Sequence, residues 1–315
     1  MSTSTIFRCA LVCLAIALPA SSAHAILFRA YLASDGSDAN PCTLAAPCRL
    51  LPAALNAVAD GGEVWMLDSA NYNTSTVNIY KSVSILAVPG AVGSIVATGG
   101  PAVQVAASGI AVALRNVVIV PLYQSGGTTG THGAVLSTAS TLVVEHSLIA
   151  NLPGVAVLSE IGGARVRIVN SILRGNGSWG LVIRNGVHAE VASTQMLGNY
   201  GGVNAYGTSA STTTITVSDS VISGGTEGAF AHSTAAGAVT KITITRSTIS
   251  HTVYPLKADS AGATSIISAN ACTVTFSEYP WYVGGASASI RTMGNNQFTD
   301  NLYAGVGSLT YTALQ

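Results

Sequence analysis

Carboxylate side chains are the first candidates for catalysis, because only 13 of the 315 residues are Asp or Glu. Glycosidic bonds are hydrolysed by two carboxyl groups placed about 5–10 Å apart, one of which acts as an acid. Glu227 and Glu278 fall at similar positions in two segments that resemble each other, two repeats apart. They are the candidate acid/base pair, and the alternative interpretation is that both are solvated loop carboxylates.

Other catalytic patterns are missing from the sequence. The histidines are scattered without His-x-His or His-x₃-His spacing, so no metal site is predicted. The Gly-x-Ser-x-Gly signature of a hydrolase elbow does not occur, and no motif calls for a cofactor. His146 is interpreted as a turn residue and not as a base. The sequence therefore favours a protein without an evident catalytic site.

Aromatic residues could bind a ligand, because flat rings along a protein wall can pack against the apolar faces of sugar rings. Five such residues follow the strands of the repeat described below, on the loop side: Trp179, Tyr206, Tyr254, Trp281 and Tyr282. They are the candidate ligand-binding residues. The alternative is that these rings anchor loops and cover the edge of the core.

A repeating segment has to position these side chains. From Thr141 onward one unit recurs as TLVVEHSLI, RVRIVNSIL, HAEVASTQM, TITVSDSVI, KITITRSTI and TSIISANAC. Alignment on the small polar residue gives the series Ser147, Ser171, Thr194, Ser220, Ser247 and Asn270, in steps of 24, 23, 26, 27 and 23 residues. This period is typical of the coils of a solenoid.

The alternation within each unit predicts strands with one apolar face. Two inward columns precede the aligned residue: Val144, Ile168, Val191, Val217, Ile244 and Ile267, and Leu142, Val166, Ala189, Ile215, Ile242 and Ser265. A third column follows it: Ile149, Leu173, Met196, Ile222, Ile249 and Cys272. Cys272 would thus replace an aliphatic residue as a buried free thiol, and the alternative role of reactive nucleophile is disfavoured.

The outward positions are mostly polar. Arg167 and Glu190 share one outward column in consecutive coils and are expected to pair, while Arg165 lies above His188 on the same solvated face. Stacked coils bury one continuous core, which a single coil cannot do. A helical solenoid would show a 3.6-residue period, and a β-sandwich does not predict in-register columns. Asn151, Asn176 and Asn199 lie just after strands, where left-handed corners are expected.

The first 25 residues predict a signal peptide. Arg8 provides a basic start, residues 9–18 form a short apolar run, and Ala23-His24-Ala25 is a small-x-small cleavage site. The alternative is a membrane anchor, but the run is shorter than the roughly 20 residues of a membrane span. Export to the periplasm or the extracellular space is therefore expected, with no membrane span after cleavage.

Cysteines and charges agree with this location. Cys42 and Cys48 flank a short loop in an oxidising compartment, so we expect a disulfide between them, with metal binding as the weaker alternative. Only 8% of the residues are charged and the net charge is zero, which argues against nucleic acid as a partner. Residues 49–59 predict a short amphipathic helix that ends at Asp60-Gly61-Gly62 and caps the solenoid.

These segments resemble a known family. YLASDGSDANPC at 31–42, PCR at 47–49 and AAL at 53–55 resemble the amino-terminal cap of bacterial right-handed parallel β-helix proteins with a pectin-lyase-like fold. GEVWML at 62–67 resembles their first coil, and the similarity covers nearly the whole mature chain. The resemblance implies an exported protein whose fold is shared with many polysaccharide-acting enzymes, although a fold does not by itself carry an activity.

The sequence therefore predicts an all-β, right-handed parallel β-helix with a short N-terminal capping helix. The expected division is a signal peptide at 1–25, a cap at 26–62 and about nine or ten coils at 63–315, with cap and coils in one domain. The predicted function is an exported scaffold or binding protein for a glycan or another extended polymer. The alternatives are a polysaccharide lyase or glycoside hydrolase, and a structural surface protein that stacks end to end.

Overall fold

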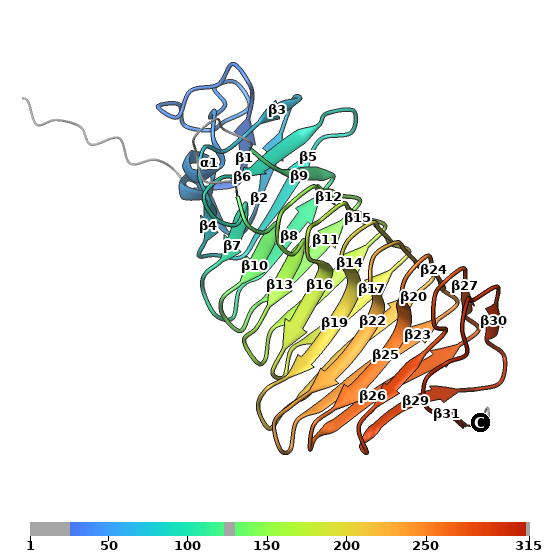
Figure 1. Ribbon diagram of the computed structural model, residues 1–315. Helices are drawn as coiled ribbons and strands as arrows, with labels where there is room; N and C mark the ends of the chain where they lie inside the picture. Colours follow the sequence, from blue (N-terminus) through green and yellow to red (C-terminus); the bar gives the residue numbers. More distant parts are fainter. Residues whose placement is uncertain (1–25, 123–129, 313–315) are drawn as a thin grey trace, which may run out of the picture.

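The computed structural model describes residues 26–122 and 130–312, so the predicted signal peptide lies outside the described residues. The chain winds into a parallel β-solenoid in which three long sheets enclose one elongated core (Figure 1). Each full coil contributes one strand to each sheet, and every strand pair is parallel. The predicted all-β solenoid is confirmed.

The sheets have twelve, nine and ten strands. The twelve-stranded sheet consists of β1 (Leu27–Leu32), β2 (Val58–Met66), β5 (Val83–Ala87), β8 (Ala111–Arg115), β11 (Thr141–Glu145), β14 (Arg165–Val169), β17 (His188–Ala192), β20 (Thr212–Ser218), β23 (Val239–Thr245), β26 (Thr264–Asn270), β29 (Ala288–Thr292) and β31 (Leu309–Tyr311). The nine-stranded sheet consists of β4 (Val77–Ile79), β7 (Val103–Val105), β10 (Ala134–Leu136), β13 (Val157–Ser159), β16 (Trp179–Arg184), β19 (Gly201–Gly207), β22 (Glu227–Ser233), β25 (Tyr254–Ser260) and β28 (Tyr282–Gly284). The ten-stranded sheet consists of β3 (Ala70–Asn71), β6 (Gly93–Ala97), β9 (Val117–Pro121), β12 (Leu148–Ala150), β15 (Ile172–Arg174), β18 (Gln195–Leu197), β21 (Val221–Ser223), β24 (Thr248–Ser250), β27 (Thr273–Thr275) and β30 (Gln297–Thr299).

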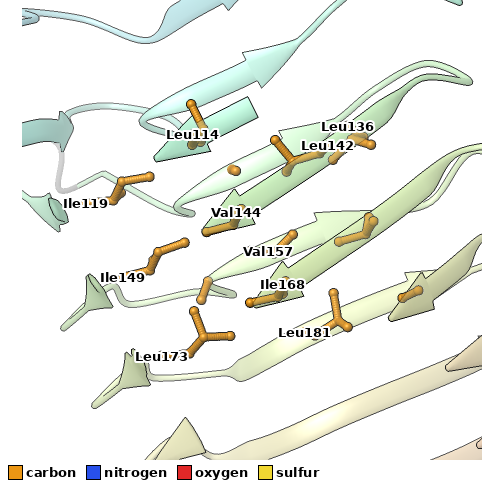
Figure 2. Packing of buried hydrophobic residues seen from close by; sticks show 14 of the residues in the cluster. Leu114, Ile119, Leu136, Leu142, Val144, Ile149, Val157, Ile168, Leu173 and Leu181 are labelled. Carbon is orange, nitrogen blue, oxygen red and sulfur yellow. The ribbon is translucent and has the colours of Figure 1, made fainter. Parts of the chain in front are cut away.

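Aliphatic columns fill the space between the sheets. Figure 2 shows Leu114, Val144 and Ile168 one beyond the other, and the strand register pairs them in the same order. A second column from the ten-stranded sheet lies beside the first, and it contains Ile149 and Leu173. All five side chains are fully buried. Stacking of like residues at about 4.8 Å thus buries the apolar face that one coil alone would expose.

A corner residue in the left-handed conformation separates most strands of the twelve-stranded sheet from the next strand of the ten-stranded sheet. His146 is one of these residues, with φ 50°, so its interpretation as a turn residue is confirmed. The aligned polar residue follows the corner and is buried. Ser171 illustrates the pattern, because its hydroxyl accepts the Ser147 N–H at 3.2 Å and donates to the Val169 carbonyl at 2.8 Å. These hydroxyls satisfy backbone groups inside the solenoid, where water cannot reach them.

The predicted alignment of the last repeat was wrong by two residues. Ile244 pairs with Ala269, and Ile267 pairs with Ile242, so the residue aligned with Ser247 is Cys272 and not Asn270. The Cys272 thiol lies 3.3 Å from the Asn270 carbonyl, in the place of the serine hydroxyl. Cys272 therefore does not replace an aliphatic residue. It is a free, buried cysteine, and burial raises the pKa of its thiol.

The left-handed corners after the strands of the ten-stranded sheet differ in part from expectation. Asn151 has φ 60° as predicted, but Gly175 and Gly198 take this conformation in the next two coils. Asn176 and Asn199, which follow them, instead form a buried ladder. The Asn176 side-chain amide donates to the Asn199 Oδ1 at 2.9 Å, which satisfies polar groups between neighbouring coils.

The N-terminal end is closed by a helix and a disulfide-bonded loop. Helix α1 (Leu51–Ala57) is shorter than the predicted 49–59, because Val58 takes an extended conformation and begins β2. Asp38 accepts the backbone N–H groups of Arg49 and Leu50, which lie just before the helix. The predicted disulfide between Cys42 and Cys48 is present. Within the described ranges, no helix is long and apolar enough to span a membrane.

Candidate functional site

The outer surface of the nine-stranded sheet carries a dense group of aromatic and charged side chains, here called the aromatic face. It lies on β16, β19, β22 and β25, which are successive neighbours in the sheet (Figure 1), and on β28, which pairs with β25. Its members are Trp179, Arg184, Asn204, Tyr206, Glu227, Phe230, His232, Tyr254, Lys257, Asp259 and Tyr282.

Strand alternation produces this face. In β22, Ala229 and Ala231 are fully buried in the core, so the intervening Phe230 and His232 point to the opposite side of the sheet. The register then places equivalent residues of successive coils in line. One outward column is Asn204, Phe230, Lys257 and Tyr282, and the other is Arg184, Tyr206, His232 and Asp259.

A glycine allows Trp179 to lie flat on the sheet. Trp179 pairs with Gly201 in the next strand, and a Cβ atom on Gly201 would come within 2.4 Å of the Trp179 ring. Real Cβ atoms do not approach other atoms this closely, so a larger residue would lift the ring. The small residue at position 201 therefore shapes one end of the aromatic face.

Four rings of the face lie nearly parallel. His232 is stacked between Tyr206, at 4.9 Å between ring centroids and 8° between planes, and Phe230, at 5.0 Å and 9°. Trp179 is stacked on Phe230 at 6.2 Å and 21°. A row of rings stacked on one another thus crosses three strands, with the 8%-exposed Trp179 at its end. The exposed parts of this row offer apolar contact for the C–H groups of sugar rings.

A lysine and a buried glutamate lie at the centre of this face. The Lys257 ammonium is 2.6 Å from Glu227 Oε1, and the Glu227 side chain is only 7% exposed. The same ammonium lies 4.5 Å from the Phe230 ring centroid and 5.4 Å from that of Tyr254. The opposite charge of Lys257 makes the burial of Glu227 tolerable, because an isolated buried carboxylate is strongly disfavoured.

The second cation of the face is also paired. Arg184 makes an ion pair with Glu160 at 2.5 Å and lies 5.2 Å from the Tyr206 ring centroid. With Asp259 included, the face and its border carry three carboxylates and two cations. It therefore has a slight excess of negative charge.

His232 is neutral at neutral pH. Burial lowers the pKa of its imidazole, and nearby Lys257 lowers it further, against the opposing effect of Asp259 and Glu227. A neutral imidazole has one donor and one acceptor nitrogen, which suits hydrogen bonding with hydroxyl groups. The site thus offers stacking surface, hydrogen-bonding groups and little net charge.

Residues 102–278 match the family model described as "Right handed beta helix region". The protein belongs to this β-helix family. The matched span contains most of the aromatic face, including β16, β19, β22 and β25. No curated protein matches the chain.

Solved structures with the same fold include a pectate lyase, a lacto-N-biosidase and an alginate lyase. Pectate lyase Pel9A superposes with a TM-score of 0.64 and 15% identity, over 91% of this chain and 78% of that one. The lacto-N-biosidase of Eubacterium ramulus gives 0.54 and 10%, over 91% and 68%. The alginate lyase of Paenibacillus sp. str. FPU-7 gives 0.53 and 13%, over 90% and 100%. At these identities the likeness establishes the fold alone.

Four of the five predicted ligand-binding aromatics of this β-helix protein lie on the aromatic face. They are Trp179, Tyr206, Tyr254 and Tyr282. Trp281 lies elsewhere, because it packs against Phe298 at 5.2 Å and its indole N–H donates to the Gly307 carbonyl. That side chain supports the last coils.

The two candidate carboxylates are in different surroundings. Glu227 is buried and bound to Lys257, whereas Glu278 is exposed and lines a shallow hollow of about 810 Å³ together with His251 and Asp300. Glu227 is in register with Tyr254, while the backbone N–H of Glu278 donates to the Thr252 carbonyl. The two glutamates therefore differ in burial and in the groups that surround them. In the described residues, no group of three or more His, Cys, Asp or Glu is arranged to hold a metal ion.

Phe230, His232, Lys257 and Asp259 were not singled out from the sequence as one group. Their signal is a second repeat, GGVNAYG, EGAFAHS and YPLKADS, which forms β19, β22 and β25. Its fourth and sixth positions are the outward columns. The sequence alignment was based on the small polar residue that lies between the twelve-stranded and ten-stranded sheets. It therefore did not detect this repeat of the nine-stranded sheet.

Proposed function

We propose that the aromatic face binds a neutral polysaccharide. The observation that carries the proposal is the near-parallel row of Trp179, Phe230, His232 and Tyr206 across three neighbouring strands. Strands in a sheet are about 4.8 Å apart, so the three strands of the row span about 10 Å from first to last. Sugar polymers present this combination of flat C–H faces and hydroxyl groups.

Charge supports a neutral polymer over an acidic one. Lys257 and Arg184 are each engaged by a carboxylate, and Asp259 adds a further negative charge. A polyuronate would bring carboxylates to a face that already has an excess of them. Neutral glycans do not meet this repulsion.

The test is binding to soluble neutral and acidic polysaccharides, by affinity electrophoresis and then by calorimetry. Tyr206→Ala should weaken binding of a neutral glycan roughly fivefold to tenfold, since a ring contact contributes about 1 kcal/mol. Tyr311→Ala removes an exposed ring from β31 of the twelve-stranded sheet and is the matched control. Equal losses in both variants, or a preference for polyuronates, would contradict the proposal.

A catalytic role is the alternative, and the observation behind it is that Glu227 and Asp259 lie on neighbouring strands of the face, because Asp259 pairs with His232 of β22. Two carboxyl groups near one bound sugar could serve as acid and base of a glycoside hydrolase, and a lyase is the other possible class. Product formation from any polysaccharide should then disappear in Glu227→Gln while binding persists. A corresponding loss in Glu278→Gln would instead move the reacting centre to the hollow near His251.

We propose further that the protein acts outside the cytoplasm, after removal of residues 1–25, as a single domain of cap and coils. The Cys42–Cys48 disulfide supports an oxidising compartment. Cap and coils share a strand pair, because β1 pairs with β2 from Leu27 to Leu32. Mass spectrometry of the exported protein tests the cleavage site, which should leave Ile26 at the N-terminus. A single cooperative unfolding transition would support one domain.

A further inference from the structure

A second hollow lies on another wall of the solenoid, across β11, β14, β17 and β20 of the twelve-stranded sheet. We call it the basic groove. It has a volume of about 340 Å³, and its lining combines guanidinium, imidazole and hydroxyl groups over a floor of small aliphatic residues. The polar residues of the groove are Thr141, Arg165, Arg167, His188, Glu190, Thr214 and Thr216.

The register sets the spacing of these groups. Arg165 pairs with His188, which pairs with Thr214, which pairs with Lys241, so these four form one outward column. Arg167 is two residues along the same strand as Arg165 and faces the same way. Its side chain therefore starts about 7 Å from that of Arg165, whereas His188 starts about 4.8 Å from Arg165. Arg165, Arg167 and His188 form a triangle of nitrogen donors.

The groove has an excess of positive charge that the protein itself does not neutralise. Arg165 and Lys241 take part in none of the ion pairs among the described residues. Arg167 and Glu190 form the predicted pair at 3.3 Å, with about half of each side chain exposed. Exposed pairs of this kind add little stability, so an incoming anion can take over Arg167 at little cost.

His188 is held in place by a threonine. Its Nδ1 lies 2.7 Å from the Thr214 hydroxyl. In the tautomer where Nδ1 accepts this hydroxyl proton, Nε2 carries the N–H and can donate to a ligand. The nearby hydroxyls of Thr141 and Thr216 add further donors along the groove.

We propose that the basic groove binds a sulfate or phosphate ester group carried by a polysaccharide. Three donor side chains that start within about 7 Å of Arg165 match the three free oxygens of a tetrahedral ester, whereas one arginine already satisfies the two oxygens of a carboxylate. The volume of the groove accommodates a sugar unit that bears the ester. A nucleic acid would need basic residues along a much longer path, and this chain has a net charge of zero.

The groove and the aromatic face are on different sheets, so the two binding proposals can fail separately. Dextran sulfate is the probe, and unmodified dextran of the same length is its control, with calorimetry as the readout. Arg165→Gln should weaken binding of dextran sulfate roughly tenfold, the usual order of magnitude for a charged hydrogen bond. Tyr206→Ala should leave that affinity unchanged.

Two further variants make the test specific. Glu190→Gln removes the one carboxylate of the groove and should tighten binding roughly twofold to fivefold, as expected for loss of a nearby like charge. Arg174→Gln removes an exposed arginine from the outer side of the ten-stranded sheet and should have no effect. Equal weakening by Arg165→Gln and Arg174→Gln would reveal unspecific charge attraction and overturn the proposal.

Competition with small anions identifies the bound group. Inorganic sulfate and inorganic phosphate should each displace dextran sulfate from the unmodified protein, and the anion effective at the lower concentration indicates which ester is preferred. Arg165→Gln should abolish this displacement beyond the general effect of an equal ionic strength of sodium chloride. Displacement that follows ionic strength alone would show that no single-anion site exists.

Discussion

The aromatic face and the basic groove are built on the same scaffold and differ in almost everything that a ligand would contact. On the aromatic face, large rings stack on one another and both cations are neutralised by carboxylates, as for Lys257 and Glu227. In the basic groove, small hydroxyls alternate with cations, and Arg165 has no counter-ion among the described residues. Because inward residues alone build the core, the outward residues of each sheet are free to specialise.

The difference shows that in a solenoid the inward residues determine the fold, while the outward residues determine which ligand can bind. Neutralised charges and stacked rings favour an uncharged partner, whereas unneutralised cations favour an anionic one. The two walls could thus contact different groups of one polymer or two different polymers. Variants that damage one wall and spare the other measure how independent the walls are.

The largest effect is expected in the core that both walls share. Val217 is fully buried, so Val217→Asp places an unpaired charge in the interior and should lower the free energy of unfolding by more than about 4 kcal/mol. Thr216→Asp, one residue away in the basic groove, should cost less than about 1 kcal/mol. Urea unfolding of both variants provides the measurement. Similar losses would mean that the inward and outward faces are assigned incorrectly.

Removal of the central cation should damage the aromatic face alone. Lys257→Met leaves Glu227 buried without its partner, and we expect a loss of about 2–3 kcal/mol, reduced from the fully buried case because Lys257 is 20% exposed. The double variant with Glu227→Gln should recover most of this loss. Sulfate binding in the basic groove should be unaffected in either variant. If Lys257→Met alone lost less free energy of unfolding than the double variant, the pairing would be contradicted.

Crowding next to Trp179 should have a smaller effect. A Cβ atom on Gly201 would lie 2.4 Å from the Trp179 ring, so Gly201→Ala should cost about 1–3 kcal/mol and expose the indole. Thermal unfolding and the tryptophan emission maximum report the two changes. In a Trp179→Leu background the same substitution should cost much less, as a double-mutant cycle would show. If Gly201→Ala lowered the free energy of unfolding equally in both backgrounds, the strain would not come from contact with the Trp179 ring.

The smallest effect concerns pH. Burial lowers the pKa of His232 in the folded protein below the unfolded value of about 6.5. As the pH falls through the unfolded pKa, the unfolded chain takes up a proton that the folded protein does not, so stability decreases. The decrease ends once the pH is below the folded pKa. His232→Phe should therefore flatten the pH dependence of urea unfolding between pH 7 and 5, and unchanged slopes would exclude this contribution.

The architecture was predictable because inward columns repeat. Ile168, Val191 and Val217 pair in succession and are fully buried, as the period-two alternation predicts. The last of the six aligned repeats was misaligned because Cys272 takes the position of a serine. Asn270 was the nearest small polar residue and was aligned in its place. The helix was predicted too long because Val58 fits an amphipathic pattern and also begins a strand.

The aromatic face was predictable only in part. Tyr206 and Trp179 attracted notice as aromatic residues, but their neighbours His232 and Lys257 have no unusual local sequence. Their grouping depends on the register of the nine-stranded sheet, whose strands follow turns of variable length. The sequence offsets of Glu227 and Glu278 also do not reveal that Glu227 is buried against Lys257 while Glu278 is exposed.

The buried hydroxyl ladder has a consequence for how the molecule can change in length. Ser147, Ser171, Thr194, Ser220 and Ser247 bond from coil to coil although they are separated by 24, 23, 26 and 27 residues, so the turns absorb every difference. Duplication of one whole coil would lengthen each wall by about 4.8 Å and leave existing bonds intact. The length of wall available to an elongated ligand is therefore set by the number of coils, and it changes by one coil at a time.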